Sequence, residues 1–307
     1  MGGPNNLEEV EVFLKNMFND PNILTMKSSL LRRFVGGMIT LLRAEQAQEI
    51  YRELGGKSPI VDHTKKLVDA LSEKLGKDVL VDFAMRYTPP FADEVVKRLK
   101  EEAIEHVCLI PLYPQFSTTT TKSSLEDFER AMHEHGLDAV TYEVKHFFDN
   151  ANYNACVLAR IKESLGDENP ADYELIFSAH GLPQKIVDKG DPYQRHVERH
   201  VDILKEMLAE EGLNFSDVRL AYQSKVGPMQ WLEPGLDESI KKVKWGQGLM
   251  IFPIAFTIDN SETVFELGVE YKEVVDEMGL ENYKVCKCPN EHPLFIEALC
   301  EIYEKMK

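Results

Sequence analysis

Short apolar runs alternate with amphipathic stretches along the whole chain. In the first half, residues 78–87 (DVLVDFAMRY) have the pattern of a strand, and residues 89–106 have that of a helix. Residues 107–116 (VCLIPLYPQF) have the pattern of a second, fully apolar strand. The polar stretch 117–124 then leads into an expected helix at 125–136. Strands that alternate with helices predict βαβ units and a parallel sheet covered on both faces.

The second half repeats this order. Residues 218–228 are expected to form a strand and loop, residues 233–246 a helix, and residues 248–256 (GLMIFPIAF) an apolar strand. The repeat predicts an α/β fold of two similar doubly wound lobes, each with a parallel four-stranded sheet, and a cleft between them. We place an N-terminal Rossmann-like lobe at 1–150 and a C-terminal one at 151–307.

The two halves differ in one strand. In the second half, residues 173–183 (YELIFSAHGLP) supply a strand before its loop, whereas the comparable loop of the first half, MGGP, begins at Met1. The repeat therefore predicts that a central strand is missing ahead of Met1, through a misassigned start codon or a real truncation.

Composition and charge narrow the class of protein. A hydrophobic content of 43% and a charged content of 28% are typical of a soluble globular protein. The net charge of −17 argues against nucleic acid and disfavours adhesion to anionic lipid. The start has no signal-peptide pattern, and the longest apolar run is too short to span a membrane. Five cysteines without a C-x-x-C motif favour a reduced, cytoplasmic location.

Three polar loops are expected at the carboxyl ends of parallel strands, where open α/β sheets bind ligands. They are SAHGLP, IAFTIDNSE and PQFSTTTTKSS. His180 directly follows an apolar strand, and Gly181 and Pro183 fix a tight turn after it. This placement favours a functional rather than a structural histidine.

The stretch FTIDNSETVFELGVEY (256–271) carries Glu262, Glu266 and Glu270 at a spacing of four residues. In an α-helix these carboxylates would stack on one side, about 6 Å apart, at a small cost in like-charge repulsion. Capping of the helix by Asp259 or its neighbours explains an acidic first turn, but not Glu266 and Glu270 beneath it.

Two other patterns resemble metal sites and do not match them. HVERH (196–200) has histidines four residues apart, but its glutamate is out of place for a metalloprotease helix. Cys286 and Cys288 are too close together for a usual four-cysteine site.

Taken together, several segments resemble a known family. They are MGGPNNLEEVEVFLKNMF, GGKSPI, IPLYPQFS, FSAHGLP, GDPY, YQSKVGPMQWLEP, FTIDNSET and CPNEHPLFIEAL. In this order and spacing the chain is similar to the ferrochelatases, which insert Fe²⁺ into a porphyrin late in haem synthesis.

The resemblance implies roles for particular residues. His180 matches the active-site histidine, described as a metal ligand or as the acceptor of pyrrole protons, and Glu262 matches its acidic partner. Glu266 and Glu270 match acidic residues that continue along the same helix, as a path for hydrated metal or for protons. The remaining matched positions are those of the porphyrin cleft and of the propionate contacts and mobile lip: Met1, Trp231, Phe256, Arg43, Tyr51 and Ser58. Phe116 is a further large apolar side chain that suits the wall of a site for a planar hydrophobic ligand.

Some features depart from the family pattern. Asn260 stands where many members have His or Cys, and Lys122 stands where glycine is common. Members with an iron–sulfur cluster carry a cysteine-rich tail, whereas here only Cys156 falls near a cluster-ligand position. The resemblance therefore implies no cofactor, and it suggests that the terminal helix packs back towards the first lobe.

The resemblance implies a reaction in which Fe²⁺ enters protoporphyrin IX and two protons leave. A coproporphyrin chelatase, a cobalt chelatase, a non-catalytic tetrapyrrole-binding protein and a truncated, inactive chain remain as alternatives. The expected partners are porphyrin and Fe²⁺, without nucleic acid. Peripheral membrane contact through an apolar lip and the oligomeric state stay open.

Overall fold

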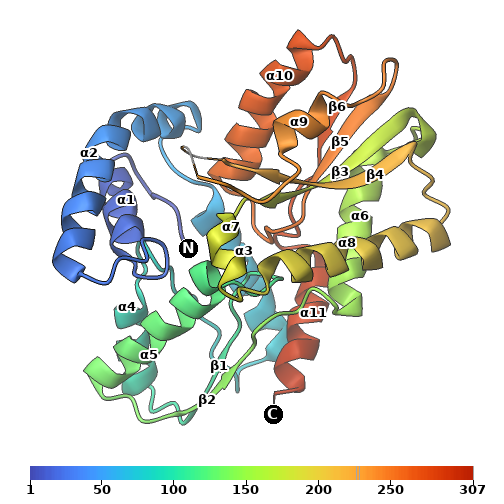
Figure 1. Ribbon diagram of the computed structural model, residues 1–307. Helices are drawn as coiled ribbons and strands as arrows, with labels where there is room; N and C mark the ends of the chain where they lie inside the picture. Colours follow the sequence, from blue (N-terminus) through green and yellow to red (C-terminus); the bar gives the residue numbers. More distant parts are fainter. Residues whose placement is uncertain (226, 228, 307) are drawn as a thin grey trace. The chain divides into compact units, whose positions relative to one another are not determined.

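The computed structural model describes residues 1–225, 227 and 229–306 (Figure 1). The chain forms two compact units. Unit 1 comprises Met1–Pro111, Ser117–Lys145 and Leu299–Lys307, and unit 2 comprises Leu112–Phe116 and His146–Ala298. The two units are defined by how residues pack in the folded chain, which does not test whether they are separate domains. The predicted domains at 1–150 and 151–307 therefore stay a prediction.

Unit 2 is built on a parallel sheet, with the strand order β4-β3-β5-β6 in the described part of the chain. These strands are β3 (Tyr173–His180), β4 (Asp217–Gln223), β5 (Gly248–Pro253) and β6 (Tyr283–Val285). Strands β3 and β5 are almost continuously buried, as expected for central strands covered on both faces. Because all four strands are parallel, the loops that follow β3, β4 and β5 lie at one edge of the sheet.

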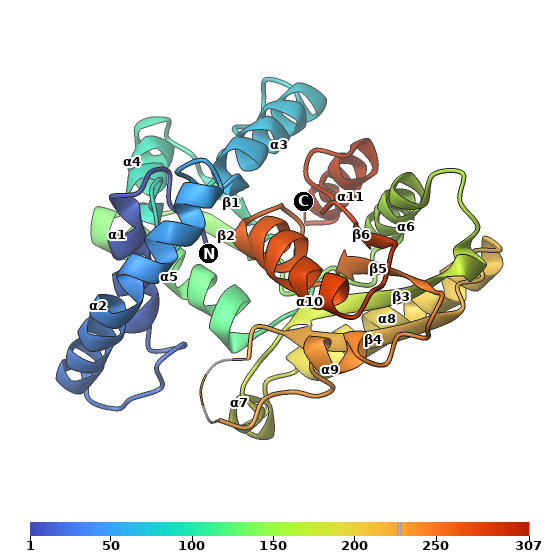
Figure 2. The same ribbon diagram turned by 90° about the horizontal axis from the view of Figure 1, so that it is seen from above.

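Helices cover both faces of this sheet (Figures 1 and 2). On one face, α9 (Leu236–Ile240), the π-helix η3 (Glu262–Glu270) and α10 (Tyr271–Glu277) pack on the strands through a buried apolar cluster. On the other face lie α6 (Ala151–Leu165) and α8 (Tyr193–Glu210). The shorter elements of unit 2 are the 3₁₀ turn η2 (Pro170–Asp172) and α7 (Gln184–Asp188).

Unit 1 contains a smaller sheet and more helix. Strands β1 (His106–Leu109) and β2 (Val140–Glu143) pair in parallel, and α4 (Ala92–Glu101) and α5 (Ser123–His135) share an apolar core with them. The π-helical turn η1 (Thr118–Lys122) leads into α5. The remaining helices of unit 1 are α1 (Glu9–Asn19), α2 (Ser29–Glu53) and α3 (Ile60–Leu75). The last helix of the chain, α11 (Pro293–Glu304), contains residues of both units.

The predicted α/β class with parallel sheets is confirmed, and four strands are found in unit 2. The four-stranded sheet predicted for the first lobe is wrong, because only β1 and β2 pair within the described residues of unit 1. The strand predicted at 78–87 is reduced to one bridge between Met85 and Phe91. A strand exists only where a neighbour completes its hydrogen bonds, and an apolar pattern does not reveal whether that neighbour is present.

Among the described residues, none of the helices combines the length and the apolar character that crossing a membrane requires.

Candidate active site

His180 is the last residue of β3, at the carboxyl edge of the sheet in unit 2. Its backbone is held on two sides: the Tyr193 hydroxyl donates to the His180 carbonyl oxygen at 2.9 Å, and the Gly181 N–H donates to the Gln223 carbonyl oxygen at 2.8 Å. The histidine is therefore fixed by α8 and by β4, the neighbouring strand.

Gly181 allows this turn to pass close to β4. A Cβ atom at Gly181 would lie 2.6 Å from the Gln223 carbonyl oxygen and 3.3 Å from Cε3 of Trp231. The Leu232 N–H also donates to the Leu182 carbonyl oxygen at 3.0 Å. Trp231 thus lies against the turn that follows His180.

Glu262 opens η3 and faces His180. His180 Nδ1 lies 2.7 Å from Glu262 Oε2, and the two side chains are 42% and 35% exposed. The start of η3 is capped locally, because the Asn260 side-chain oxygen accepts from the Glu262 N–H at 2.8 Å and the Thr263 hydroxyl accepts from the Asn260 N–H at 3.0 Å.

Asp259 holds the same loop in place through buried hydrogen bonds. Its buried carboxylate accepts from the Thr263 hydroxyl at 2.9 Å, the Asn290 side-chain amide at 2.6 Å and the Cys288 N–H at 3.2 Å. Three donors stabilise a charge that would otherwise be costly to bury. Asp259 therefore fixes the loop that orients Glu262.

The acidic helix is not the α-helix expected from the four-residue spacing. Residues Glu262–Glu270 form a π-helix, whose hydrogen bonds span five residues and widen each turn. Side chains four residues apart therefore do not superpose as they would in an α-helix. Such segments are uncommon and frequently occur at functional sites.

The three carboxylates of this helix have different surroundings. Glu262 pairs with His180, and Glu270 is exposed to solvent. Glu266 accepts from the Ser224 hydroxyl at 2.8 Å and from the Gln223 side-chain amide at 3.3 Å. Along the helix, the first carboxylate is therefore paired with a histidine, the second is partly buried beside the end of β4, and the third is exposed to water.

Charge and burial set the protonation of this group. Burial alone lowers the pKa of His180, but the Glu262 carboxylate, with its hydrogen bond, and the charge of Glu266 together raise it to about 9. Burial, with the charge of Glu262, raises the pKa of Glu266 to about 7. At neutral pH the resting His180 is therefore an imidazolium, and Glu266 titrates near neutrality.

The other predicted residues of unit 2 lie on loops, and two of them, Phe256 and Trp231, lie beside His180 or the turn that follows it. The Phe256 ring is T-shaped to the His180 imidazole, with centroids 6.4 Å apart and an interplanar angle of 89°. Phe116 is half-buried, and its N–H donates to His196 Nδ1 at 3.2 Å. The structure thus brings Phe256 and Trp231 next to the turn and ring of His180, and it connects Phe116 to α8.

The predicted residues of unit 1 form two groups. The Met1 carbonyl oxygen accepts from the Tyr87 N–H at 2.9 Å, and the Ser58 N–H donates to the Pro4 carbonyl oxygen at 2.8 Å, so the first residues lie beside Ser58. Arg43 and Tyr51 are on α2: the Arg43 guanidinium lies 6.0 Å from the Phe18 ring centroid, and Tyr51 packs in the core between α1 and α2.

Sequence reasoning missed the residues that hold Glu266. Gln223 ends β4 and Ser224 follows it, and this loop was not among the three candidate loops. Ser224 has φ +64°, which is uncommon for a non-glycine residue. The Gln223 side chain also accepts from the Ser178 hydroxyl at 2.7 Å, which fixes its amide. A polar QS pair at the end of an apolar strand was the available signal.

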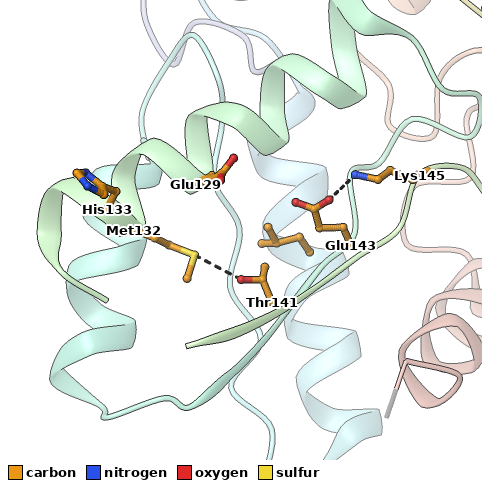
Figure 3. A pocket seen from close by; sticks show the side chains of 7 residues that line it. Glu129, Met132, His133, Thr141, Glu143 and Lys145 are labelled. Atoms are coloured by element: carbon orange, nitrogen blue, oxygen red, sulfur yellow. Dashed lines mark hydrogen bonds and ion pairs between the residues drawn. The ribbon is translucent and has the colours of Figure 1, made fainter. Parts of the chain in front are cut away.

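A separate pocket lies in unit 1, with a volume of about 740 Å³ (Figure 3). Its lining residues are Leu109, Glu129, Met132, His133, Thr141, Glu143 and Lys145. None of the predicted site residues lines it, and Lys145 pairs with Glu143. Within the residues that the structure describes, no cluster of three or more His, Cys, Asp or Glu side chains is arranged to hold a metal ion.

The fold of the chain is that of a chelatase. SirB from Bacillus subtilis, solved with Fe³⁺, is similar with a TM-score of 0.56 and 15% identity, over 79% of this chain and 89% of that chain. The sirohydrochlorin chelatase SirB from Bacillus subtilis subspecies spizizenii, in complex with cobalt, gives a TM-score of 0.57 and 12% identity, over 80% and 89%.

Sequence comparison narrows this class to one family. The Ferrochelatase family model matches residues 1–307. The ferrochelatase of Sulfurimonas denitrificans is 59% identical over 307 residues, which cover 100% of this chain and 97% of that protein. The ferrochelatase of Nitratiruptor sp. is 52% identical over 306 residues, with coverage of 100% and 97%. The chain belongs to the ferrochelatase family, and it is a lyase that inserts iron into a porphyrin in haem synthesis.

Proposed function

We propose that the chain inserts Fe²⁺ into protoporphyrin IX, with His180 and Glu262 as the residues that exchange protons and contact the metal. The observation that supports this is the 2.7 Å contact between His180 Nδ1 and Glu262 Oε2 at the carboxyl edge of the sheet. A histidine can accept a proton or bind Fe²⁺ as neutral imidazole, and a carboxylate suits the same cation.

Metallation replaces two pyrrole protons by one dication. In the resting pair His180 carries a proton, so this proton has to leave before the imidazole can accept another. Glu266, with a pKa of about 7, is a suitable receiver, because groups that titrate near the working pH relay protons best. We assign Glu266 and Glu270 to a path that leads protons out or hydrated metal in, and its exposed end is Glu270.

The macrocycle needs broad apolar walls, and it exposes its nitrogens to an incoming ion when it bends. Trp231 and Phe256, next to His180, are the walls that we assign in unit 2, together with Phe116. Binding energy from such remote contacts is what offsets ring strain. Met1 is assigned to porphyrin binding as well, and Arg43, Tyr51 and Ser58 to positions near the propionates, on the family pattern.

No cofactor takes part in this proposal, because Fe²⁺ is the substrate. An iron–sulfur cluster requires several thiolates, whereas burial raises the pKa of the Cys156 thiol to about 12. Iron and sulfide analysis of the purified protein, with its visible spectrum, tests this. Stoichiometric sulfide with a cluster spectrum would contradict it.

We assign the enzyme to the cytoplasm, with peripheral membrane contact through α2. Leu30, Phe34, Leu41 and Leu42 of this helix are 68–76% exposed. Residues 21–44 also contain four basic and no acidic residues, although the chain as a whole carries a net charge of −17. Exposed apolar side chains among cations are the pattern of a helix that lies on an anionic bilayer.

Vesicle flotation tests the membrane contact. Wild type should float with anionic vesicles and remain unbound to neutral ones. The double variant Leu41→Ser/Leu42→Ser should lose flotation, whereas Leu80→Ser, which changes an exposed leucine outside α2, should not. Equal flotation of both variants would argue against α2.

The activity is tested by anaerobic Fe²⁺ or Zn²⁺ insertion, followed through porphyrin absorbance. Protoporphyrin IX and coproporphyrin are compared at equal concentration, and Co²⁺ with a reduced corrin precursor provides the third arm. Faster turnover of protoporphyrin supports the proposal. Preference for either other substrate would replace it, and binding without insertion in all arms would indicate a tetrapyrrole carrier.

A further inference from the structure

The histidines of the HVERH motif are one turn apart on α8, and both accept hydrogen bonds. His200 is fully buried, with Gln115 Nε2 at 2.9 Å from Nδ1 and Asn154 Oδ1 at 2.8 Å from Nε2. The Asn154 amide is oriented by donating to the Phe148 carbonyl oxygen at 3.0 Å. His200 Nδ1 is therefore the acceptor and Nε2–H the donor, so the ring is neutral. Burial lowers its pKa to about 3.

His196 accepts one bond, from the backbone. The Phe116 N–H donates to its Nδ1 at 3.2 Å. Its ring packs against Phe148 and His146, with centroid distances of 4.9 and 5.0 Å. Because an imidazolium has no lone pair at Nδ1, this bond exists only in the neutral form of His196.

The segment Leu112–Phe116 is also tied to the end of β5. Gln115 Nε2 donates to the Ile254 carbonyl oxygen at 3.1 Å, and the Thr257 hydroxyl donates to the Leu112 carbonyl oxygen at 2.8 Å. Phe256, whose ring meets His180, lies between these two anchor points in sequence. The neutral histidines of α8 thus hold Phe116 in a fixed place relative to the loop of Phe256.

The geometry points to His196 and His200 as positioning residues for Phe116. Protonation of His196 breaks its hydrogen bond with the Phe116 N–H, whereas His200 stays neutral. The role in porphyrin binding rests on the proposed function, in which Phe116 is a wall of the porphyrin site. The hydrogen bonds themselves do not depend on it. The motif that resembles a zinc helix is here a pair of hydrogen-bond acceptors.

Several charged groups act on His196. Burial lowers its pKa, as do the charges of His146 and of Arg195 on its own helix, whereas Asp191 and Asp149 raise it. The net direction is downward from 6.5. The Phe116 bond is therefore intact at neutral pH and opens as the pH falls below that value, while His200 stays neutral throughout.

Two variants separate hydrogen bonding from packing. His196→Gln keeps a neutral acceptor that does not titrate, and His196→Phe keeps an aromatic ring but has no acceptor. His133→Gln, on α5, is the matched control. Protoporphyrin IX affinity of the full chain is measured without metal from pH 4 to 8, a range that extends well below the ordinary pKa of histidine. It is expressed as the ratio of variant to wild type, which cancels titration of the propionates.

Wild type should lose about fivefold in affinity on acidification relative to His196→Gln, the fold-change of one hydrogen bond of ordinary net strength. His196→Phe should bind about fivefold more weakly than wild type at pH 8, and this difference should disappear as the pH falls through the midpoint of His196. The positioning role is overturned if His196→Gln follows the wild-type pH dependence, or if His196→Phe binds like wild type at pH 8.

A readout without porphyrin keeps this separate from the proposed function. In ¹⁵N-labelled wild type, the Phe116 amide signal should titrate with the midpoint of His196, and it should not titrate in His196→Gln. An amide that ignores His196 overturns the inference. If the Phe116 amide titrates with His196 but the chain binds no porphyrin, the positioning role of His196 is supported and the proposed function is overturned instead.

Discussion

His180 Nδ1 lies 2.7 Å from Glu262 Oε2, which joins the last residue of β3 to the first residue of η3. Each partner is fixed independently, His180 by Tyr193 and the Gly181 turn, and Glu262 by the Asn260 cap above Asp259. The pair is thus preorganised before either substrate arrives, which is the condition for a proton transfer that costs little reorganisation.

Replacing His180 by alanine should abolish insertion and leave porphyrin binding within a few-fold of wild type. The His180 imidazole lies within hydrogen-bond distance of Glu262, where it can take a proton, and general-base contributions are on the order of 10²–10⁴-fold in kcat. Turnover by stopped-flow absorbance and porphyrin affinity by fluorescence quenching measure the two effects. His133→Ala is the control, and wild-type turnover of His180→Ala would sink the assignment.

Glu262→Gln should move the rising limb of the pH–rate profile to lower pH. Glu262 is the main reason that the pKa of His180 stands at about 9, and without that charge burial pulls it towards or below 6.5. The limb of log kcat/KM for free enzyme should therefore shift from near pH 9 by about two units, whatever the loss in absolute rate. An unshifted limb would assign the titration to another group.

The same pair makes a stability contribution with a definite sign. Because the folded-state pKa of His180 is raised above its unfolded value, the contribution is full below pH 6.5 and is lost as the pH rises through about 9. The imidazole is 42% exposed, so water screens the interaction, and we expect a loss of about 1–2 kcal/mol. Urea unfolding of wild type and Glu262→Gln from pH 6 to 10 measures it.

The sequence was sufficient to predict that two of the three candidate loops meet. An apolar strand before SAHGLP and another before TIDNSE implied parallel neighbours, and β3 and β5 pair along six residues with His180 at the shared edge. The roles given to His180 and Glu262 came from family resemblance and stay predictions that the tests above address.

What the sequence did not reveal depends on tertiary partners. Gln223 and Ser224 became part of the site only because β4 pairs with β3 and brings its end beside Glu266. The π-helix likewise has no pattern of its own, since the four-residue spacing of glutamates also fits an α-helix. The predicted strand at 78–87 failed for the same reason, because no hydrogen-bonded neighbour could be inferred from its apolar residues.

Glu266→Gln should slow metal delivery more than it weakens porphyrin binding. Glu266 lies behind the His180–Glu262 pair, where groups that support metal ligands typically change metal affinity by about 10–100-fold. The KM for Fe²⁺ should rise by about tenfold, with porphyrin affinity within about twofold of wild type. Glu273→Gln, an exposed carboxylate on α10, is the control. Unchanged dependence on Fe²⁺ would count against the path.

The same variant should be more stable than wild type at alkaline pH. The folded-state pKa of Glu266 is raised to about 7 from 4.5, so wild type loses stability as the pH rises between those values. Glutamine keeps an oxygen acceptor for Ser224 and removes the charge. We expect a gain of about 1–3 kcal/mol in unfolding free energy at pH 8 and none at pH 4. Equal stability of wild type and Glu266→Gln at pH 8 would show that the ionised Glu266 carboxylate does not destabilise the folded protein.

Gly181→Ala should damage the site through the backbone alone. The new Cβ atom would lie 2.6 Å from the Gln223 carbonyl oxygen, which belongs to a paired strand and cannot move cheaply. The turn must shift instead, so the Gly181 N–H bond lengthens and His180 leaves its 2.7 Å contact with Glu262. Overpacking of this kind costs about 1–3 kcal/mol in stability, and a misplaced catalytic group costs about 100-fold in rate.

Gly37→Ala, where the added Cβ meets nothing within 4 Å, should be neutral or slightly stabilising. Thermal unfolding and insertion kinetics of the two variants decide this, and wild-type kinetics in Gly181→Ala would show that the close approach to β4 does not position His180.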